Sequence, residues 1–138
     1  MIASSLIALS PVDGRYQDRV SALRAYFTEL GLIRLRVRVE IAWLRMLAAE
    51  PSLGEIPPLS DEMAAALERI ESGFSSEDGA RVKAIEAETN HDVKAVEYFL
   101  REKLPLHSHT DALTGFIHFA CTSEDINNVC HALMLVES

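Results

Sequence analysis

The chemistry that this sequence could carry is concentrated in three short polar stretches. The first, SPVDGRY at residues 10–16, is expected to form a turn, because Pro11 restricts the backbone and Gly14 tolerates a positive φ. In that turn Arg15 and Tyr16 could offer a guanidinium fork and a hydroxyl to a phosphate group. On these residues alone, a plain loop with a solvated arginine is the favoured interpretation, since short motifs often arise by chance.

The second stretch, TNHDV at residues 89–93, lies where a helix is expected to begin. Either Asn90 or Asp92 could be the N-cap residue, and that role would explain both of them. His91 is not needed for capping, and it could donate a hydrogen bond to an anion held at the positive end of the helix. The residues by themselves leave both interpretations open.

The third stretch, CTSEDINNVCHAL at residues 121–133, gathers more polar groups than a helix start needs. Thr122 or Ser123 is a natural N-cap, and Glu124 and Asp125 suit the positive end of the helix dipole. The two acids would repel a bound anion. An anion site here therefore requires that Thr122, Ser123 and free backbone N–H groups meet the ligand while the acids point elsewhere or bind polar partners.

Other reactive side chains give weaker signals. His107 and His109 have no third ligand beside them, so we expect no metal site, and Ser123 has no base within its own helix turn. Cys121 and Cys130 fall in one predicted helix, about 13 Å apart at the helical rise per residue. They cannot form a disulfide there, which favours reduced thiols and a cytoplasmic protein.

Length and charge limit the class of protein. The 138 residues are enough for one domain with a buried core, and 21 acidic against 13 basic residues give a net charge of −8. An acidic chain of this kind has no general surface for nucleic acid or an anionic membrane. No signal peptide and no apolar run of membrane-spanning length is recognisable.

The elements that must position these stretches are all predicted to be helices. A proline-rich linker at 51–59 separates them, Gly31 offers a helix stop, and no strand pair with hairpin turns is found. Helical spacing is seen in residues 20–30, 32–50, 60–73, 75–89, 92–103, 110–120 and 123–138. The last helix becomes apolar on all sides at Met134 and Leu135, so we expect it to continue into a larger core of a longer protein.

The helix predicted at 32–50 should lie in the middle of a bundle. Two broad apolar stripes run along it, and Arg34 and Arg38 share a narrow polar sector. Arg36 and Glu40 lie on the other side, where they are expected to pair with each other at i,i+4 spacing. A helix of this pattern is buried on two sides.

Taken in order, SSLIALSPVDGRY, TNHDVKAVEYFL and FIHFACTSEDINN resemble the N-terminal portion of the bacterial adenylosuccinate lyase family, within the fumarase/aspartase superfamily. The resemblance extends over essentially the whole chain. It implies an all-α homotetramer with a bundle of long central helices, in which each site takes residues from three subunits. Residues 1–111 would be the helical N-terminal domain and residues 112–138 the beginning of the central bundle domain.

The resemblance also implies the reaction, which is β-elimination of fumarate. The substrates would be adenylosuccinate, giving AMP, and the succinyl-carboxamide ribotide of purine biosynthesis, and no metal or organic cofactor is implied. Arg15 and Tyr16 would hold the phosphate region. Asn90, His91 and Asp92 would line the substrate, with His91 assisting rather than acting as the main acid.

Thr122 and Ser123 would bind the ligand at a helix start. The general acid and base of the family would lie beyond residue 138, so the chain alone is predicted to be inactive. Two alternatives remain: another lyase of the superfamily, such as one acting on argininosuccinate, and a helical interaction module without catalysis.

Overall fold

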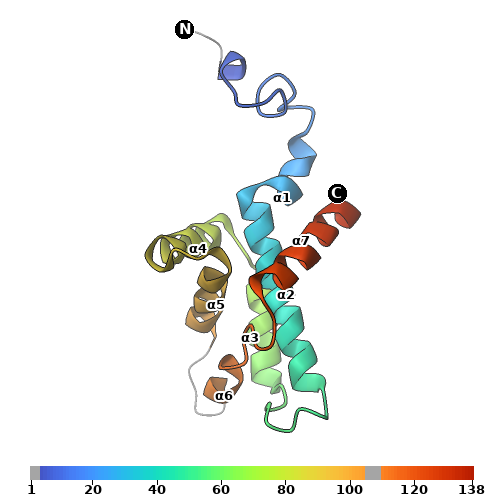
Figure 1. The fold of residues 1–138 in the computed structure, drawn as a ribbon, viewed down its shortest axis with the longest axis vertical. Helices are drawn as coiled ribbons and strands as arrows, with labels where there is room; N and C mark the ends of the chain where they lie inside the picture. The colour runs from blue at the N-terminus through green and yellow to red at the C-terminus, as the bar shows by residue number, and fades with distance from the viewer. Residues whose placement is uncertain (1–3, 105–109) are drawn as a thin grey trace.

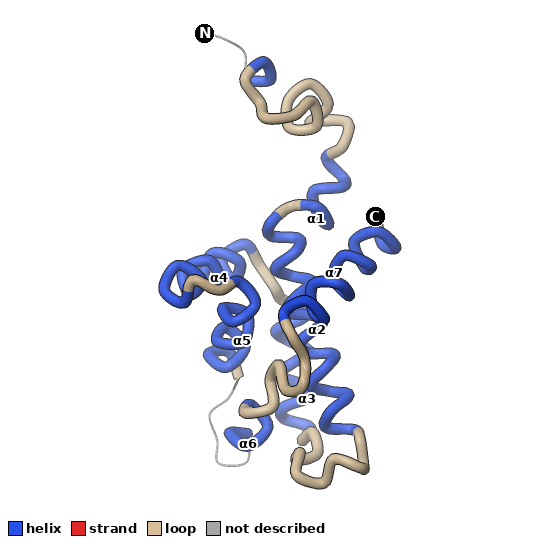
Figure 2. The backbone as a smooth tube through the Cα atoms, viewed as in Figure 1, coloured by secondary structure: helices blue, strands red, loops and turns tan. Residues whose placement is uncertain are grey.

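The computed structural model describes residues 4–104 and 110–138, and every regular element in them is helical (Figures 1 and 2). Two short 3-10 turns, Ser4–Leu6 and Ser21–Leu23, precede the first α-helix. The α-helices are α1 (Arg24–Phe27), α2 (Glu29–Ala49), α3 (Asp61–Ser72), α4 (Ser76–Thr89), α5 (Asp92–Lys103), α6 (Thr110–Thr114) and α7 (Ser123–Glu137). The expected all-α fold is confirmed.

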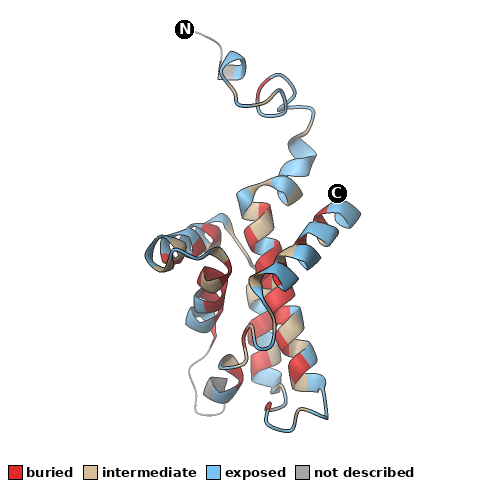
Figure 3. Ribbon diagram, viewed as in Figure 1, coloured by how far each residue is buried: buried red, intermediate tan, exposed pale blue. Residues whose placement is uncertain are grey.

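Helix α2 is the central element, and it is buried on two sides as its sequence predicts (Figure 3). On one side it packs on α3, α4 and α5 in a core that includes Ile41, Leu67 and Phe99. On the other side it packs on α7. The buried residues of this second core are Leu35, Val39, Val93, Ile126, Cys130 and Met134.

The helix predicted at 20–30 is divided at Thr28, a break that was not predicted. Thr28 is extended, and its hydroxyl accepts a hydrogen bond from the Gly31 backbone N–H at 3.2 Å, so Thr28 ends α1 and caps α2. Gly31 was expected to stop or bend the helix, but it lies buried inside the first turn of α2. A Cβ at this position would meet the Tyr26 carbonyl oxygen at 2.6 Å. Its role is therefore to allow close approach of the chain.

Most of the other predicted boundaries are confirmed, and one is wrong. Ser60 caps α3, and Ser75 caps α4 in a reciprocal arrangement with Asp78. The helix expected at 110–120 stops at Thr114 and is followed by turns. Two residues in those turns, His118 and Ala120, are left-handed with φ of 62° and 59°. Each costs about 1 kcal/mol or more, which other contacts must offset.

The last helix has an apolar side that the described residues leave uncovered. Met134 is buried against α2, but Leu135 is 74% exposed and Val136 is 82% exposed.

Among the helices that the structure describes, none is both long and apolar enough to cross a membrane.

Candidate functional site

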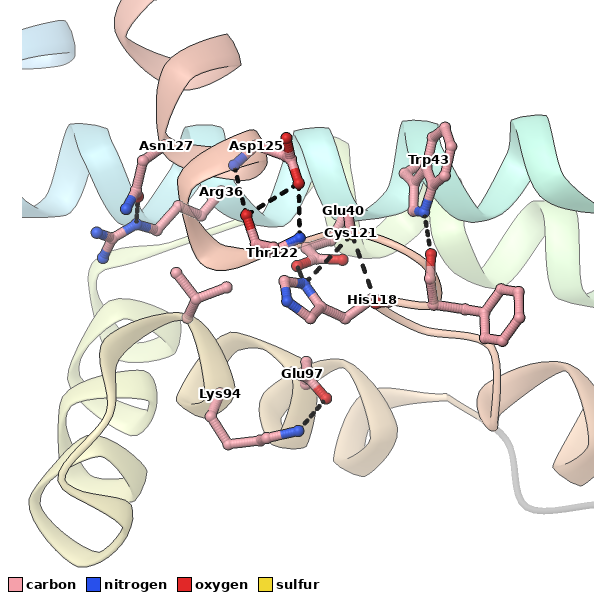
Figure 4. Close-up of polar contacts among 12 residues, drawn as sticks. Arg36, Glu40, Trp43, Lys94, Glu97, His118, Cys121, Thr122, Asp125 and Asn127 are labelled. Atoms are coloured by element: carbon pink, nitrogen blue, oxygen red, sulfur yellow. Dashed lines mark hydrogen bonds and ion pairs between the residues drawn. The ribbon is translucent and has the colours of Figure 1, made fainter.

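The second and third polar stretches meet at one buried side chain, Arg36 of α2. Figure 4 shows its contact with Asn127 of the third stretch. Its Nε donates to Oδ1 of Asn127 on α7 at 2.9 Å, and its Nη2 donates to Oδ2 of Asp92 on α5 at 2.5 Å. Arg36 is only 6% exposed, so these bonds form largely away from water. The predicted pairing of Arg36 with Glu40 is wrong, because packing on two sides brings each of them within reach of partners on other segments.

The N-cap residue of α5 is His91, which was not predicted to cap this helix. Asn90 is left-handed, with φ of 53°, and ends α4. His91 is the N-cap of α5, since its Nδ1 accepts a hydrogen bond from the Lys94 backbone N–H at 3.2 Å. The expectation that Asn90 or Asp92 caps this helix is therefore wrong. His91 is exposed, and no hydrogen bond of its other ring nitrogen is found among the residues that the structure describes.

Asp92 is held as a carboxylate by its neighbours. Partial burial alone would raise the pKa of its carboxyl group, but hydrogen bonding to the Val93 N–H and the nearby Arg36 guanidinium outweigh it and lower the pKa. Asp92 lies with Asn90 and His91 on the wall of an open cavity of about 510 Å³, and Lys83 from α4 also lines it. A charged hydrogen-bond donor, Lys83, and neutral polar groups such as the Asn90 amide therefore line the same cavity.

The start of α7 is confirmed as a helix cap, and Thr122 is the residue that provides it. Thr122 Oγ1 accepts from the Asp125 backbone N–H at 3.3 Å, while Oδ2 of Asp125 accepts from the Thr122 N–H at 2.7 Å and from its hydroxyl at 2.9 Å. These bonds lower the pKa of Asp125. The expectation that the acids point elsewhere or bind polar partners is confirmed for Asp125, whose carboxylate is bound to the Thr122 N–H and hydroxyl.

Ser123 differs from Thr122 in its bonding. Within the part of the chain that the structure describes, no hydrogen bond of the Ser123 hydroxyl is found. Of the two residues predicted to bind a ligand here, Ser123 is thus the one whose hydroxyl needs no rearrangement.

A further cluster beside this helix start was not predicted. Glu40 of α2 is fully buried, and its Oε1 lies 2.6 Å from Nδ1 of His118 in the loop before α7. The Sγ atom of Cys121 lies 3.6 Å from the same nitrogen, and Trp43 donates from Nε1 to the Phe119 carbonyl at 2.8 Å (Figure 4). Two features of the sequence could have indicated this cluster: Glu40 lies between the apolar stripes of its helix, and His118 comes four residues before Thr122.

The first polar stretch lies apart from the other two. It forms the predicted turn, and the Arg15 guanidinium lies 5.3 Å from the centre of the Tyr16 ring. Both residues are exposed on the N-terminal segment, which extends beyond the first turn of α2, at the far end of the molecule from α3 and α6 (Figure 1). The structure of this one chain does not bring Arg15 or Tyr16 to the turn between α4 and α5.

Of the residues considered for disulfide or metal chemistry, the structure describes the two cysteines but not His107 and His109. Cys121 precedes α7, so the prediction that it shares a helix with Cys130 is wrong, but both are free thiols. Burial raises the pKa of each thiol to about 11. His107 and His109 lie outside the described residues. Within residues 4–104 and 110–138, no group of three or more acidic, histidine or cysteine side chains could hold a metal ion.

Comparison with known proteins identifies the class to which this helical fold and polar site belong. Residues 14–138 match the sequence profile of a family described as lyases, and the chain therefore belongs to that lyase family.

Among individual proteins the similarity is to adenylosuccinate lyases. The chain is 57% identical over 135 residues to the adenylosuccinate lyase of Escherichia coli strain K12 and 56% identical to that of Haemophilus influenzae. It is 53% identical over 138 residues to that of Vibrio cholerae. These matches cover 98–100% of this chain but only 30% of each relative. The chain therefore spans less than a third of their length.

Proposed function

We propose that this chain supplies part of the substrate site of an enzyme that eliminates fumarate from adenylosuccinate, giving AMP, and from the succinyl-carboxamide ribotide of purine biosynthesis. The observation that carries the proposal is the identity of 53–57% to adenylosuccinate lyases over nearly the whole chain. The meeting of the two polar stretches at Arg36 supports it, because Asp92 and Asn127, 35 residues apart in the sequence, bond to the same guanidinium.

The residues of this chain act in binding and orientation. Asn90, His91 and Asp92 line the substrate around the 510 Å³ cavity, and the free nitrogen of His91 gives a hydrogen bond to an anionic group. Ser123 contacts the ligand through its hydroxyl, and Thr122 joins when its bonds to Asp125 rearrange. His91, Asp92, Thr122 and Ser123 lie at the N-terminal ends of α5 and α7, and a helix N-terminus is a suitable place for an anion. Asn90 lies instead at the C-terminal end of α4.

Arg15 and Tyr16 hold the phosphate region in this proposal, although they lie apart from the other residues within one chain. A homotetramer whose sites take residues from three subunits accounts for that separation. We divide the chain at residues 1–111 and 112–138, with α7 as the first helix of the central domain. The enzyme acts in the cytoplasm and needs no cofactor.

The general acid and base of the reaction are provided by the part of the relatives that this chain does not span. One group removes the proton β to the breaking C–N bond and the other protonates the leaving nitrogen. The 138-residue chain by itself is then inactive.

The deciding experiment is a fumarate-release assay on the 138-residue chain and on the protein translated from the extended reading frame. Adenylosuccinate is the substrate, and argininosuccinate is the control. We expect activity only from the longer protein and only with adenylosuccinate. Activity with argininosuccinate instead would favour the other superfamily lyase. No fumarate from either substrate would leave a helical interaction module without catalysis.

A further inference from the structure

The loop between α6 and α7 is held in an unfavourable backbone conformation by two residues of α2. His118 and Ala120 are both left-handed, a region that only a few per cent of non-glycine residues adopt, histidine more often than alanine. Glu40 contacts the His118 ring at 2.6 Å, and Trp43, one helical turn further on, donates to the Phe119 carbonyl at 2.8 Å. Without such contacts the loop would relax toward ordinary backbone angles.

Burying the Glu40 carboxyl group in the core costs free energy of folding. Glu40 is fully buried, and its Oε2 atom has no hydrogen-bond partner among the residues that the structure describes. Burial raises the pKa of its carboxyl group even though His118 opposes that shift. A buried acid with one unsatisfied oxygen stabilises a fold less than an apolar side chain of the same size would. Its presence is better explained by what it positions than by stability.

The group that it positions leads directly into the proposed binding residues. His118 is four residues before Thr122, and no regular element intervenes between the loop and the start of α7. The other charged group that acts on the Glu40 carboxyl is Glu97 of α5, which is paired with Lys94 at 2.8 Å. Asp125, whose charge acts on His118, is bound to Thr122. In the part of the chain that the structure describes, neither of these is hydrogen-bonded to residues 115–120, whereas Glu40 contacts His118 and Trp43 is bonded to Phe119. These two contacts link α2 to the loop.

We propose that Glu40 is a positioning residue for the substrate site. Through the hydrogen bond between its Oε1 and Nδ1 of His118 it fixes the left-handed loop, and through the loop it sets the position of Thr122 and Ser123. The consequence for binding rests on the proposed function, whereas the fixing of the loop does not.

The loop can be followed without any substrate, because Trp43 is the one tryptophan of this chain and is bonded to the loop backbone. Glu40→Met and His118→Asn each remove one partner, and asparagine tolerates the left-handed angle. Glu97→Met is the matched control, since it removes a second buried glutamate that does not contact the loop. We expect acrylamide quenching of Trp43 to increase in the first two variants and to stay at the wild-type value in the control.

Thermal unfolding separates positioning from a merely structural role. Glu40→Met should melt at or above the wild-type temperature, while His118→Asn should melt lower because it leaves the buried carboxylate without a partner. The double variant should recover the Glu40→Met value. Unchanged Trp43 quenching in both single variants, or an equal increase in Glu97→Met, would overturn the proposal. If Glu40→Met does not fold, the His118→Asn quenching decides.

The catalytic consequence is measured in the protein translated from the extended reading frame. Glu40→Met should raise KM for adenylosuccinate about tenfold, with kcat changed by less than about threefold. An unchanged KM despite a loosened loop would refute the link to binding. If the wild-type protein has no lyase activity, the proposed function fails, and the quenching data still judge the contact between Glu40 and the loop.

Discussion

Removing the Arg36 side chain should be among the most damaging single changes to this fold outside its apolar core. Arg36→Met keeps the buried aliphatic stem but deletes the bonds to Asn127 and Asp92. A hydrogen bond involving a charged group contributes about 1.5–3 kcal/mol. The Asp92 side chain is 42% exposed, so water can replace part of its bond, and that contribution must be discounted.

The two bonds together then amount to about 2–3 kcal/mol of unfolding free energy. For a chain of this size that corresponds to a fall in Tm of about 8–12 °C. Urea unfolding and thermal unfolding followed by circular dichroism provide the two measurements. Arg34→Met is the matched control on the same helix, because Arg34 is exposed, and it should change the free energy by less than about 0.5 kcal/mol.

A double-variant cycle tests whether the loss arises from the bond itself. Asp92→Asn and Arg36→Met should be non-additive by about 0.5 kcal/mol or more if the two side chains interact directly. An Arg36→Met protein that unfolds within about 0.5 kcal/mol of the wild type would refute the view that Arg36 joins α5 and α7 to α2.

Three further outcomes are expected. Folding lowers the pKa of Asp92, so its contribution to stability is complete above the unfolded-state pKa of 3.8 and is lost as the pH falls through the folded-state pKa. Asp92→Asn should therefore make the unfolding free energy depend less steeply on pH in the acid range. Gly31→Ala should destabilise by about 1–3 kcal/mol because its Cβ would meet carbonyl oxygens, whereas Gly54→Ala, where nothing lies within 4 Å, should be neutral or slightly stabilising in the same urea titration. With pKa values of about 11, Cys121 and Cys130 should react with iodoacetamide at pH 8 far more slowly than in urea, and equal rates would contradict their burial.

Local features of the sequence determined most of the helices and their starts. A hydroxyl followed three residues later by a backbone N–H is a short-range interaction, so Ser60, Ser75 and Thr122 could be recognised as caps from the sequence. The two apolar stripes likewise predicted that α2 is buried on two sides. These features depend on residues within one or two helical turns of each other, and for that reason they need no knowledge of the fold.

Tertiary structure decided which partners the polar side chains of α2 would have. Arg36 and Glu40 have the spacing of a surface ion pair, yet one bonds to Asp92 and Asn127 and the other to His118. In a buried setting a charged group must be satisfied by whatever packs against it, and only the folded chain brings α5, α7 and the loop within reach. The left-handed turn at His118 has the same origin, because a backbone conformation that costs energy locally persists only where distant contacts stabilise it.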